Sequence, residues 1–509
     1  MTSKSACSRG PAPSPHTPAP VCCAGTAKLS RESDSVLVSP ATGSLPYCLE
    51  SGSPVAHYMV GFLCTVLGLV PEFLTREGAA VRPHLYYGDQ PLPTSRVVIP
   101  LRTSNLVWAQ ILEAGERDPD LKPRLSFDVI DAMRMLLTDE VNARQPATAF
   151  GRDDRLLFAR SFQAQHGIAH LPVVNGYVRM LAQLIKRELH AATVPLWPDA
   201  KQATIGLSHD VDRPDKYGIL RAVRERRRPR LAVWPRFYAK ALYHATQRLR
   251  DPHPDDFWLF DHIMAAESKL GFRSTFFFAS MPSFGAWGAF EDVNYDISWP
   301  RFGPLFRSMV AGGFEIGLHA SYNAHQASGR LAAERQRLED VAGVPARGLR
   351  HHYWHLGPNV NRTLRFHEEC GFLYDSSLAF NEHMGFRRNV ALPFHPWDPD
   401  RSLPVRTLQL PTFCMDGNLF YGRMDVGSAV REVKRYVDTI KRLGGLGVID
   451  WHVRTSYPGN TKFRDWGRAY LEILELLAAE HDLWVTNLGE IATWVTQREE
   501  VLFSQNSAG

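Results

Sequence analysis

The sequence lacks the cysteine patterns of a disulfide framework or a thiolate metal site. Its seven cysteines are an odd number in 509 residues, and they form neither a CxxC pair nor any other metal-ligand spacing. Ordinary thiols in a reducing compartment are the simplest interpretation. Residues 1–50 also contain no continuous apolar core behind a basic start, so no secretory signal is evident and we expect a cytoplasmic protein.

Long apolar runs and nucleotide-binding loops are missing too. The longest apolar stretch, Tyr58 to Val70, has about 13 residues before Pro71, whereas a helix needs about 20 to span a bilayer. We therefore expect a buried helix there and no integral membrane segment. Neither a GxGxxG fingerprint nor a GxxxxGK phosphate loop follows any predicted strand, which disfavours a nucleotide-binding fold.

Charge is nearly balanced over the whole chain. The net charge is +5, from 58 Lys and Arg against 53 Asp and Glu, so nucleic acid is not an expected partner. One local exception is a basic run with Trp234 close behind it, made of Arg221, Arg224, Arg226, Arg227, Arg228 and Arg230. Such a run could meet phosphates or an acidic glycan, or it could be an ordinary solvated face.

The chain divides by composition into a tail and two folded parts. Residues 1–50 are rich in Pro, Ser, Ala and Gly and predict a disordered tail. Residues 55–195 contain the helical pattern Phe127 to Leu137 and the strand-like Val97 to Ile99, which together predict a small α/β domain. The proline-containing stretch from Pro195 to Asp199 predicts a linker to the next part.

The third part, residues 200–497, alternates short apolar runs with longer helical patterns. The predicted buried strands are Ala203 to Leu207, Ser274 to Ala279, Phe314 to Leu318, Leu446 to Asp450 and Leu483 to Thr486. The predicted helices are Asp255 to Leu270, Gly329 to Val341, Asn359 to Cys370, Ser428 to Leu443 and Arg464 to Glu480. This alternation is typical of an α/β barrel or a doubly wound sheet.

Carboxylates and imidazoles stand at the ends of three predicted strands. Asp210 and Asp212 follow the first strand, His319 follows the Phe314 strand, and His452 follows the Leu446 strand. Active sites of parallel α/β folds lie at such strand ends, although a single polar residue there is as often a cap or turn. Asp210 and Asp212 are two apart on extended chain and face one side, so one can bind metal while the other acts as a base. Neutral imidazoles and a carboxylate suit Zn²⁺ with an open position.

At these residues the sequence resembles the polysaccharide deacetylase superfamily, the NodB-homology barrels of carbohydrate esterase family four. The likeness covers about residues 200–497, and its landmarks occur in the family's order. They are Ser208-His209-Asp210-Val211-Asp212, Thr275-Phe276-Phe277, Gly313 to His319, Arg350, Tyr374-Asp375-Ser376-Ser377 and Asp450-Trp451-His452. The resemblance implies a distorted (β/α) barrel, preceded here by the smaller α/β domain and the disordered tail.

A softer resemblance concerns residues 55–195. Phe127 to Asp131 and His170 to Val174 look like parts of a poorly characterised domain that precedes this barrel in some bacterial members. No function is implied by that likeness.

The resemblance assigns roles to individual residues. Asp210 matches the general base and His452 the general acid, Arg350 would orient the base, and Asp375 would support the neighbourhood of His452. Asp212 and His319 match metal ligands of a divalent ion, which we take as Zn²⁺. The implied reaction removes acetyl from an N-acetylated sugar: Asp210 takes a proton from water and His452 protonates the leaving amine.

The sequence departs from the family pattern in two places. Asp-Val-Asp stands where many members have adjacent aspartates, so the base and metal roles could be exchanged. The family's second metal histidine usually follows the first by four residues, but that position here is Asn323, and His325 would face elsewhere on a helix. The third ligand could come from the next strand, as His352 or His351. We prefer His352.

Three classes of function fit these observations. The first is a metal-dependent deacetylase acting on N-acetylated glycans or glycan precursors, and it is favoured because both proton-transfer residues are retained. The second is another hydrolase of non-peptide C–N bonds on the same barrel. The third is a catalytically silent glycan-binding barrel. Acetate release and metal content distinguish the three.

Overall fold

The structure, a computed structural model, describes residues 43–101, 121–143, 145–151, 154–225, 227, 234–253, 256–285 and 288–504. Most of the predicted tail, residues 1–42, lies outside these ranges, as do three arginines of the basic run. The tail was expected to reach residue 50, but Ser44–Leu49 forms strand β1. Burial of Leu45, Tyr47 and Leu49, which alternate along this strand, accounts for the difference.

The N-terminal region is a small α/β fold, as predicted. Four strands pair in parallel in the order β2-β1-β3-β4. Its elements are β1, α1 (Pro54–Leu67), β2 (Val70–Phe73), α2 (Arg76–Ala79), β3 (His84–Tyr87), β4 (Ser95–Ile99), α4 (Val129–Leu137), α5 (Glu140–Ala143), α6 (Phe162–Gln165) and α7 (Val173–Leu189). The apolar stretch after Tyr58 lies within α1, which ends at Gly68 because that residue adopts a left-handed φ of 67°.

A nine-stranded parallel sheet forms the second region, in the order β12-β9-β8-β7-β6-β5-β14-β13, with β15 pairing to β5 as well. The strands are β5 (Ala203–Val211), β6 (Thr275–Phe278), β7 (Glu315–Ala320), β8 (Gly348–His351), β9 (Tyr374–Asp375), β12 (Leu408–Gln409), β13 (Thr412–Met415), β14 (Leu446–Asp450) and β15 (Leu483–Thr486). A short hairpin of β10 (Trp397–Asp398) and β11 (Leu403–Pro404) stands apart from it. The sheet curls into the distorted (β/α) barrel that the sequence predicts, and all five predicted strands are present.

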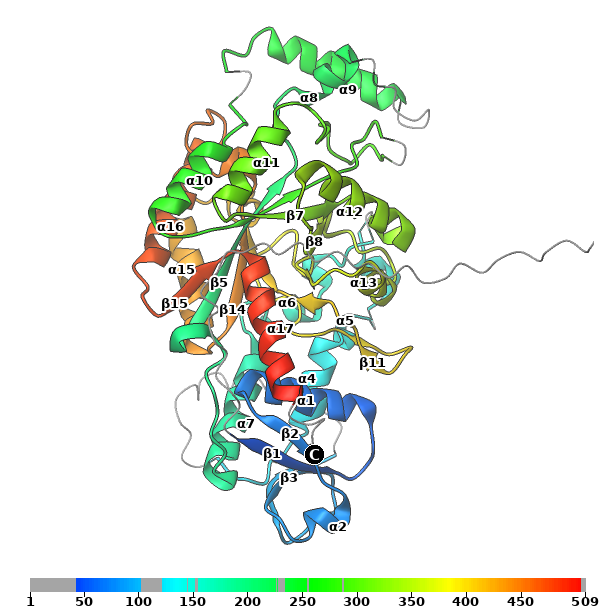
Figure 1. The fold of residues 1–509 in the computed structure, drawn as a ribbon, viewed down its shortest axis with the longest axis vertical. Coiled ribbons are helices and arrows are strands. Elements are labelled where there is room, and N and C mark those ends of the chain that lie inside the picture. Colours follow the sequence, from blue (N-terminus) through cyan, green and yellow to red (C-terminus); the bar gives the residue numbers. More distant parts are fainter. Residues whose placement is uncertain are drawn as a thin grey trace, which may run out of the picture. The chain divides into compact units, whose positions relative to one another are not determined.

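Helices cover this sheet and connect its strands (Figure 1). They are α8 (Gly218–Arg224), α9 (Trp234–Arg248), α10 (Phe260–Lys269), α11 (Phe302–Ala311), α12 (Ser328–Ala342), α13 (Val360–Glu369), α14 (Asp416–Phe420), α15 (Val426–Arg442), α16 (Arg464–Ala478) and α17 (Leu488–Ser504). Five of them, α10, α12, α13, α15 and α16, correspond to the helices predicted from periodicity. Capping residues stabilise the ends of some of these helices. At the start of α15, for example, the side chain of Asp425 accepts a hydrogen bond from the Ser428 N–H.

The two regions share one hydrophobic core. Helix α17 lies beside α1, as Figure 1 shows, and residues of both helices belong to one buried cluster with β14. The buried Arg498 of α17 donates hydrogen bonds to the carbonyl oxygens of Val194 and Pro195, and to that of Thr65 in α1. The described residues from 43 to 504 accordingly belong to one compact unit. A functional division of the chain at the Pro195 segment stays a prediction.

The structure shows the state of the described cysteines and the length and polarity of the described helices. The described cysteines, Cys48, Cys64, Cys370 and Cys414, are free thiols. Within the described ranges, every helix is too short or too polar to cross a membrane.

Candidate active site

The predicted site residues gather at the carboxyl ends of neighbouring strands. Asp210 is the last residue but one of β5 and Asp212 follows that strand, while His319 lies near the end of β7. Arg350 lies on β8 directly opposite His319 in the sheet register. His452 follows β14, the strand that pairs with the other edge of β5. Parallel pairing brings these strand ends to one edge, which is why side chains far apart in sequence meet there.

Asp212, His319 and His352 form one cluster of metal-type donor atoms. His319 Nε2 lies 3.2 Å from Asp212 Oδ1, and His352 Nε2 lies 3.4 Å from the same oxygen. His319 Nδ1 donates to the Arg350 carbonyl oxygen at 3.0 Å, so the neutral ring presents a lone pair at Nε2. Both Asp212 Oδ1 and His319 Nε2 are buried and make no hydrogen bond within the described residues. Either a proton or a metal cation between these two atoms would satisfy both of them.

The titratable groups around Asp212 shift one another's pKa values. Burial alone would raise the pKa of Asp212, but His452, His319 and His352 outweigh it and hold the pKa well below its usual range. Burial likewise opposes a charged His319, yet Asp210 and Asp212 raise its pKa. The carboxylates and the imidazoles of the cluster thus stabilise each other's charged forms.

Arg350 connects two further carboxylates. The guanidinium is fully buried, and its Nη1 lies 2.9 Å from Asp210 Oδ1 and 2.9 Å from Asp450 Oδ1. Its Cζ stands 4.5 Å from the centre of the Phe277 ring and 5.2 Å from that of Trp354, so two aromatic rings fix its plane. Burial and the charge of Asp210 raise the pKa of Asp450 to about 7.

Asp210, Asp450 and His452 also bring ligand-type atoms together. Here, however, the Arg350 guanidinium already lies between the two carboxylates and supplies the positive charge. A metal ion at that point would be repelled by it. Asp210 thus lies beside Arg350, whereas Asp212 lies beside the two histidines of the other cluster.

His452 lies between two carboxylates. Its Nδ1 donates to Asp416 Oδ1 at 2.9 Å, and its Nε2 lies 3.1 Å from Asp212 Oδ2. Burial opposes a charged ring, but Asp416 and Asp212 hold the pKa of His452 well above its usual value. Arg454 Nη1 also donates to Asp212 Oδ2 at 3.2 Å, so this oxygen is occupied while Oδ1 faces the histidines.

The remaining predicted residues lie elsewhere. Asp375 was expected near His452, but it accepts hydrogen bonds from the N–H and hydroxyl of Ser377 and faces His367, with 3.9 Å between His367 Nδ1 and Asp375 Oδ2. Its strand, β9, pairs with β8 and β12, and a role of Asp375 in supporting the neighbourhood of His452 stays a prediction. Asp375 positions the segment after β9, where the Ser376 carbonyl oxygen accepts from Arg350 Nε.

The two alternative third ligands are also engaged elsewhere. His351 Nε2 lies 2.9 Å from His367 Nε2 in a buried pair. His325 packs against His355, with 4.2 Å between ring centres. Of the three candidates, the structure brings only His352 into the cluster with Asp212 and His319 within the described residues.

Sequence reasoning missed Asp416 as the partner of His452 and left Asp450 without a role. A usable signal existed for both. Asp416 follows the buried strand β13, and Asp450 is the last residue of β14, so each occupies a strand end like the residues that were predicted. The register of β13 and β14 places Asp416 and Asp450 close together, because Met415, the residue before Asp416, pairs with Asp450.

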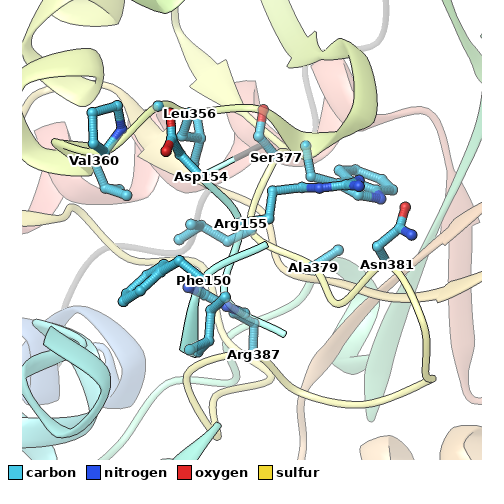
Figure 2. A pocket seen from close by; sticks show the side chains of 14 residues that line it. Phe150, Asp154, Arg155, Leu356, Val360, Ser377, Ala379, Asn381 and Arg387 are labelled. Atoms are coloured by element: carbon cyan, nitrogen blue, oxygen red, sulfur yellow. The ribbon is translucent and has the colours of Figure 1, made fainter. Parts of the chain in front are cut away.

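A pocket beside the site contains residues of both regions. Figure 2 shows Arg155 of the N-terminal region among Ser377, Ala379 and Asn381 of the barrel. The pocket volume is about 60 Å³, room for a few water molecules. Trp354 lines it as well and also contacts Arg350, so the pocket adjoins the Arg350 cluster.

Comparisons with known proteins found similarity only among solved structures. No family model matches the chain, and no curated protein matches it. A structure from Mycobacterium smegmatis, provisionally assigned as a polysaccharide deacetylase, shares 19% identity over 60% of this chain and 93% of its own, with a TM-score of 0.41. A family 4 carbohydrate esterase from Streptomyces lividans, solved with acetate, shares 12% identity over 56% and 93%, with a TM-score of 0.27.

A third match is a pseudoenzyme of the same esterase family from Bacillus anthracis, with 10% identity over 57% of this chain and 65% of that one, and a TM-score of 0.27. Because these TM-scores are below 0.5, the functional conclusion depends on this chain's own side chains.

Proposed function

We propose that this chain is a metal-dependent hydrolase that removes acetyl from N-acetylated sugars of a polysaccharide or glycan precursor. The observation that carries the proposal is the order of groups at the strand ends. A set of metal donors, centred on Asp212, stands between a carboxylate held by Arg350 and an imidazole held by Asp416. Hydrolysis of an unactivated amide requires a base, a metal site and an acid that lie next to one another in this spatial order.

Asp212, His319 and His352 would hold the metal. Two imidazoles and one carboxylate are a donor set that suits Zn²⁺ and leaves a position open, and the unpaired Asp212 Oδ1 and His319 Nε2 fit this assignment. When bound, the ion would supply Lewis-acid chemistry, polarising the amide carbonyl and acidifying water. Metal identity is part of the proposal.

Asp210 acts as the general base. One of its oxygens is engaged by Arg350, which fixes the carboxylate in place, and the other lies 3.7 Å from His319 Nε2, next to the metal donors. That second oxygen is therefore the one that takes a proton from the attacking water. Arg350 holds the carboxylate without neutralising it by proton transfer, because a guanidinium does not release its proton in proteins.

His452 acts as the general acid. The hydrogen bond from Nδ1 to Asp416 fixes the ring orientation and stabilises its cationic form, so the transferable proton is on Nε2. This nitrogen faces Asp212 from the opposite side to the two metal histidines. It can protonate the amine as the C–N bond breaks, which prevents expulsion of an amide anion.

The test is acetate release from N-acetylhexosamine oligomers by purified protein whose metal content is measured in parallel. Wild-type protein is expected to contain a divalent ion and release acetate, whereas Asp210→Asn should retain the ion and lose at least about a hundredfold in rate. Acetate release that is unaffected by this substitution would refute the mechanism.

Other outcomes identify the alternative functions. Cleavage of cyclic or linear amides without acetate release would indicate a different C–N hydrolase on this barrel. Metal-free protein that binds the oligomers without turnover would indicate a silent glycan-binding barrel. We propose a cytoplasmic location with no nucleic-acid partner; fractionation of cells that produce the protein would check the location.

A further inference from the structure

Helix α9 exposes an unusual number of large apolar side chains. Leu242 is 70% exposed and Tyr243 61%, while Leu249, directly after the helix, is 88% exposed. Trp234 and Tyr238 on the same helix are exposed as well. An isolated exposed leucine needs no explanation, but a contiguous exposed apolar patch marks an interaction surface.

Trp234, Tyr238 and Leu242 form a second apolar face of α9, distinct from the one that packs inward. Trp234, Tyr238 and Leu242 follow one another at intervals of four residues and so line one stripe of the helix. The inward face is elsewhere on the circumference: Phe237 is buried and packs against Phe284, with ring centres 6.3 Å apart. A helix that only covers the barrel needs the inward face alone.

The surroundings of α9 are strongly cationic. Between residues 218 and 250 the residues that the structure describes include seven Lys or Arg and one Glu, a local charge of +6 in a chain whose total is +5. Arg236, Lys240 and Arg248 lie on α9 itself, and Arg221 and Arg224 lie on α8, which packs against it. In Figure 1 the two helices lie together at one end of the barrel sheet.

We propose that α9, together with the cations of the described residues 218–225, 227 and 234–250, binds the surface of an anionic lipid bilayer. Leucine, tryptophan and tyrosine on one face with cations beside them are the composition of helices that lie in the membrane interface. The aliphatic side chains insert below the headgroups, and the Lys and Arg side chains meet the phosphates. The helix lies on the membrane rather than spanning it.

Two other occupants fit the observations less well. An acidic polysaccharide would satisfy the cations, but it offers no apolar medium for Leu242 and Leu249. A second copy of the chain would cover the leucines, but it would bring two regions of charge +6 against each other. An anionic bilayer satisfies both features together.

The inner face of α9 is connected to the candidate active site. His244 lines a small cavity together with Asp212 and Tyr295. A docked α9 therefore holds the Asp212 cluster close to the bilayer surface. If the deacetylase assignment is correct, the glycan substrate is presented at that surface; membrane binding itself does not depend on that assignment.

Flotation of the full chain with lipid vesicles tests the proposal. We expect binding to phosphatidylcholine vesicles containing 30% (about a third) phosphatidylglycerol, at least about tenfold tighter than to phosphatidylcholine alone, and weakened by salt. The double substitution Leu242→Glu with Leu249→Glu should reduce binding at least about tenfold. Leu403→Glu is the matched control, since Leu403 is also largely exposed but lies on the β10–β11 hairpin.

A second variant, Arg236→Glu with Arg248→Glu, keeps the apolar stripe and should remove the preference for anionic vesicles. Circular dichroism confirms that each variant is folded. The proposal is overturned if wild-type protein does not float with anionic vesicles, or if Leu403→Glu loses binding equally. It is also overturned by binding to polygalacturonate without vesicle binding, or by dimerisation that Leu242→Glu abolishes. None of these measurements depends on catalytic activity. A failure of the membrane-binding proposal can therefore be distinguished from a failure of the deacetylase proposal.

Discussion

Replacing His352 by alanine tests which histidine completes the metal-binding set. The cluster has three donor atoms, one each from Asp212, His319 and His352. The substitution removes the one from His352 and leaves the other two in place. His319 keeps its hydrogen bond to the Arg350 carbonyl oxygen, so the orientation of that ring does not change. The variant thus isolates the contribution of one ligand.

The expected loss follows from the number of ligands. Structural Zn²⁺ sites with four protein ligands bind with about 10–16 kcal/mol, or roughly 3 kcal/mol for each ligand. Each 1.4 kcal/mol changes an equilibrium constant about tenfold, so the dissociation constant should rise by about two orders of magnitude. Residual binding through the two remaining donors should still be detectable.

The assay is competition for Zn²⁺ against a chromophoric chelator, with metal content after dialysis as a second readout. His325→Ala is the matched control, because His325 is a nearby histidine that packs on His355 and lies outside the donor cluster. Urea unfolding checks that both variants are folded. Unchanged affinity in His352→Ala, or a larger loss in His325→Ala, would refute the assignment of the third ligand.

Three further predictions concern the groups around the metal donors. Asp416→Asn should lower kcat about 10–100-fold, because a charge-assisted hydrogen bond to the acid imidazole is lost, while Asp425→Asn, a helix cap, should have no effect in the same acetate assay. Arg350→Met should reduce the free energy of unfolding by about 3–5 kcal/mol in urea titrations, since it leaves buried carboxylates unpaired; a loss below 1 kcal/mol (roughly that of a surface pair) would contradict this. Gly348→Ala should destabilise the fold by about 1–3 kcal/mol, because its Cβ would lie 1.9 Å from a tyrosine ring of β9, whereas Gly329→Ala has open space and should be neutral or stabilising in thermal melts.

Strands with continuous apolar runs were predictable from the sequence. Residues of β5 and β14 are buried on both faces, so each appears as an uninterrupted apolar run ending in polar residues. Short strands were not predictable in the same way. Two-residue strands such as Tyr374–Asp375 and Leu408–Gln409 show no periodicity of their own and exist only because a neighbouring strand pairs with them.

The N-terminal region shows a second limit of local patterns. Composition and linker prolines indicated a boundary near Pro195, but they contain no information about packing across it. The structure places α1 beside α17 and closes their contact with the buried Arg498, whose hydrogen bonds reach residues about three hundred positions earlier in the chain.

The sequence by itself determined the chemistry that is available at the site. It supplied two aspartates on one extended segment, an imidazole at the end of a second strand and another after a third, because residue type and strand-end position can be read locally. Tertiary structure decided how these groups are partnered. Pairing of β13 with β14 brings Asp416 to His452. His352, directly after β8, lies in the cluster with Asp212, whereas His351 and His325 do not. The hydrogen-bond and ion-pair partners of each site residue depend on the distances between strands. These distances are set only when the strands pair into the sheet.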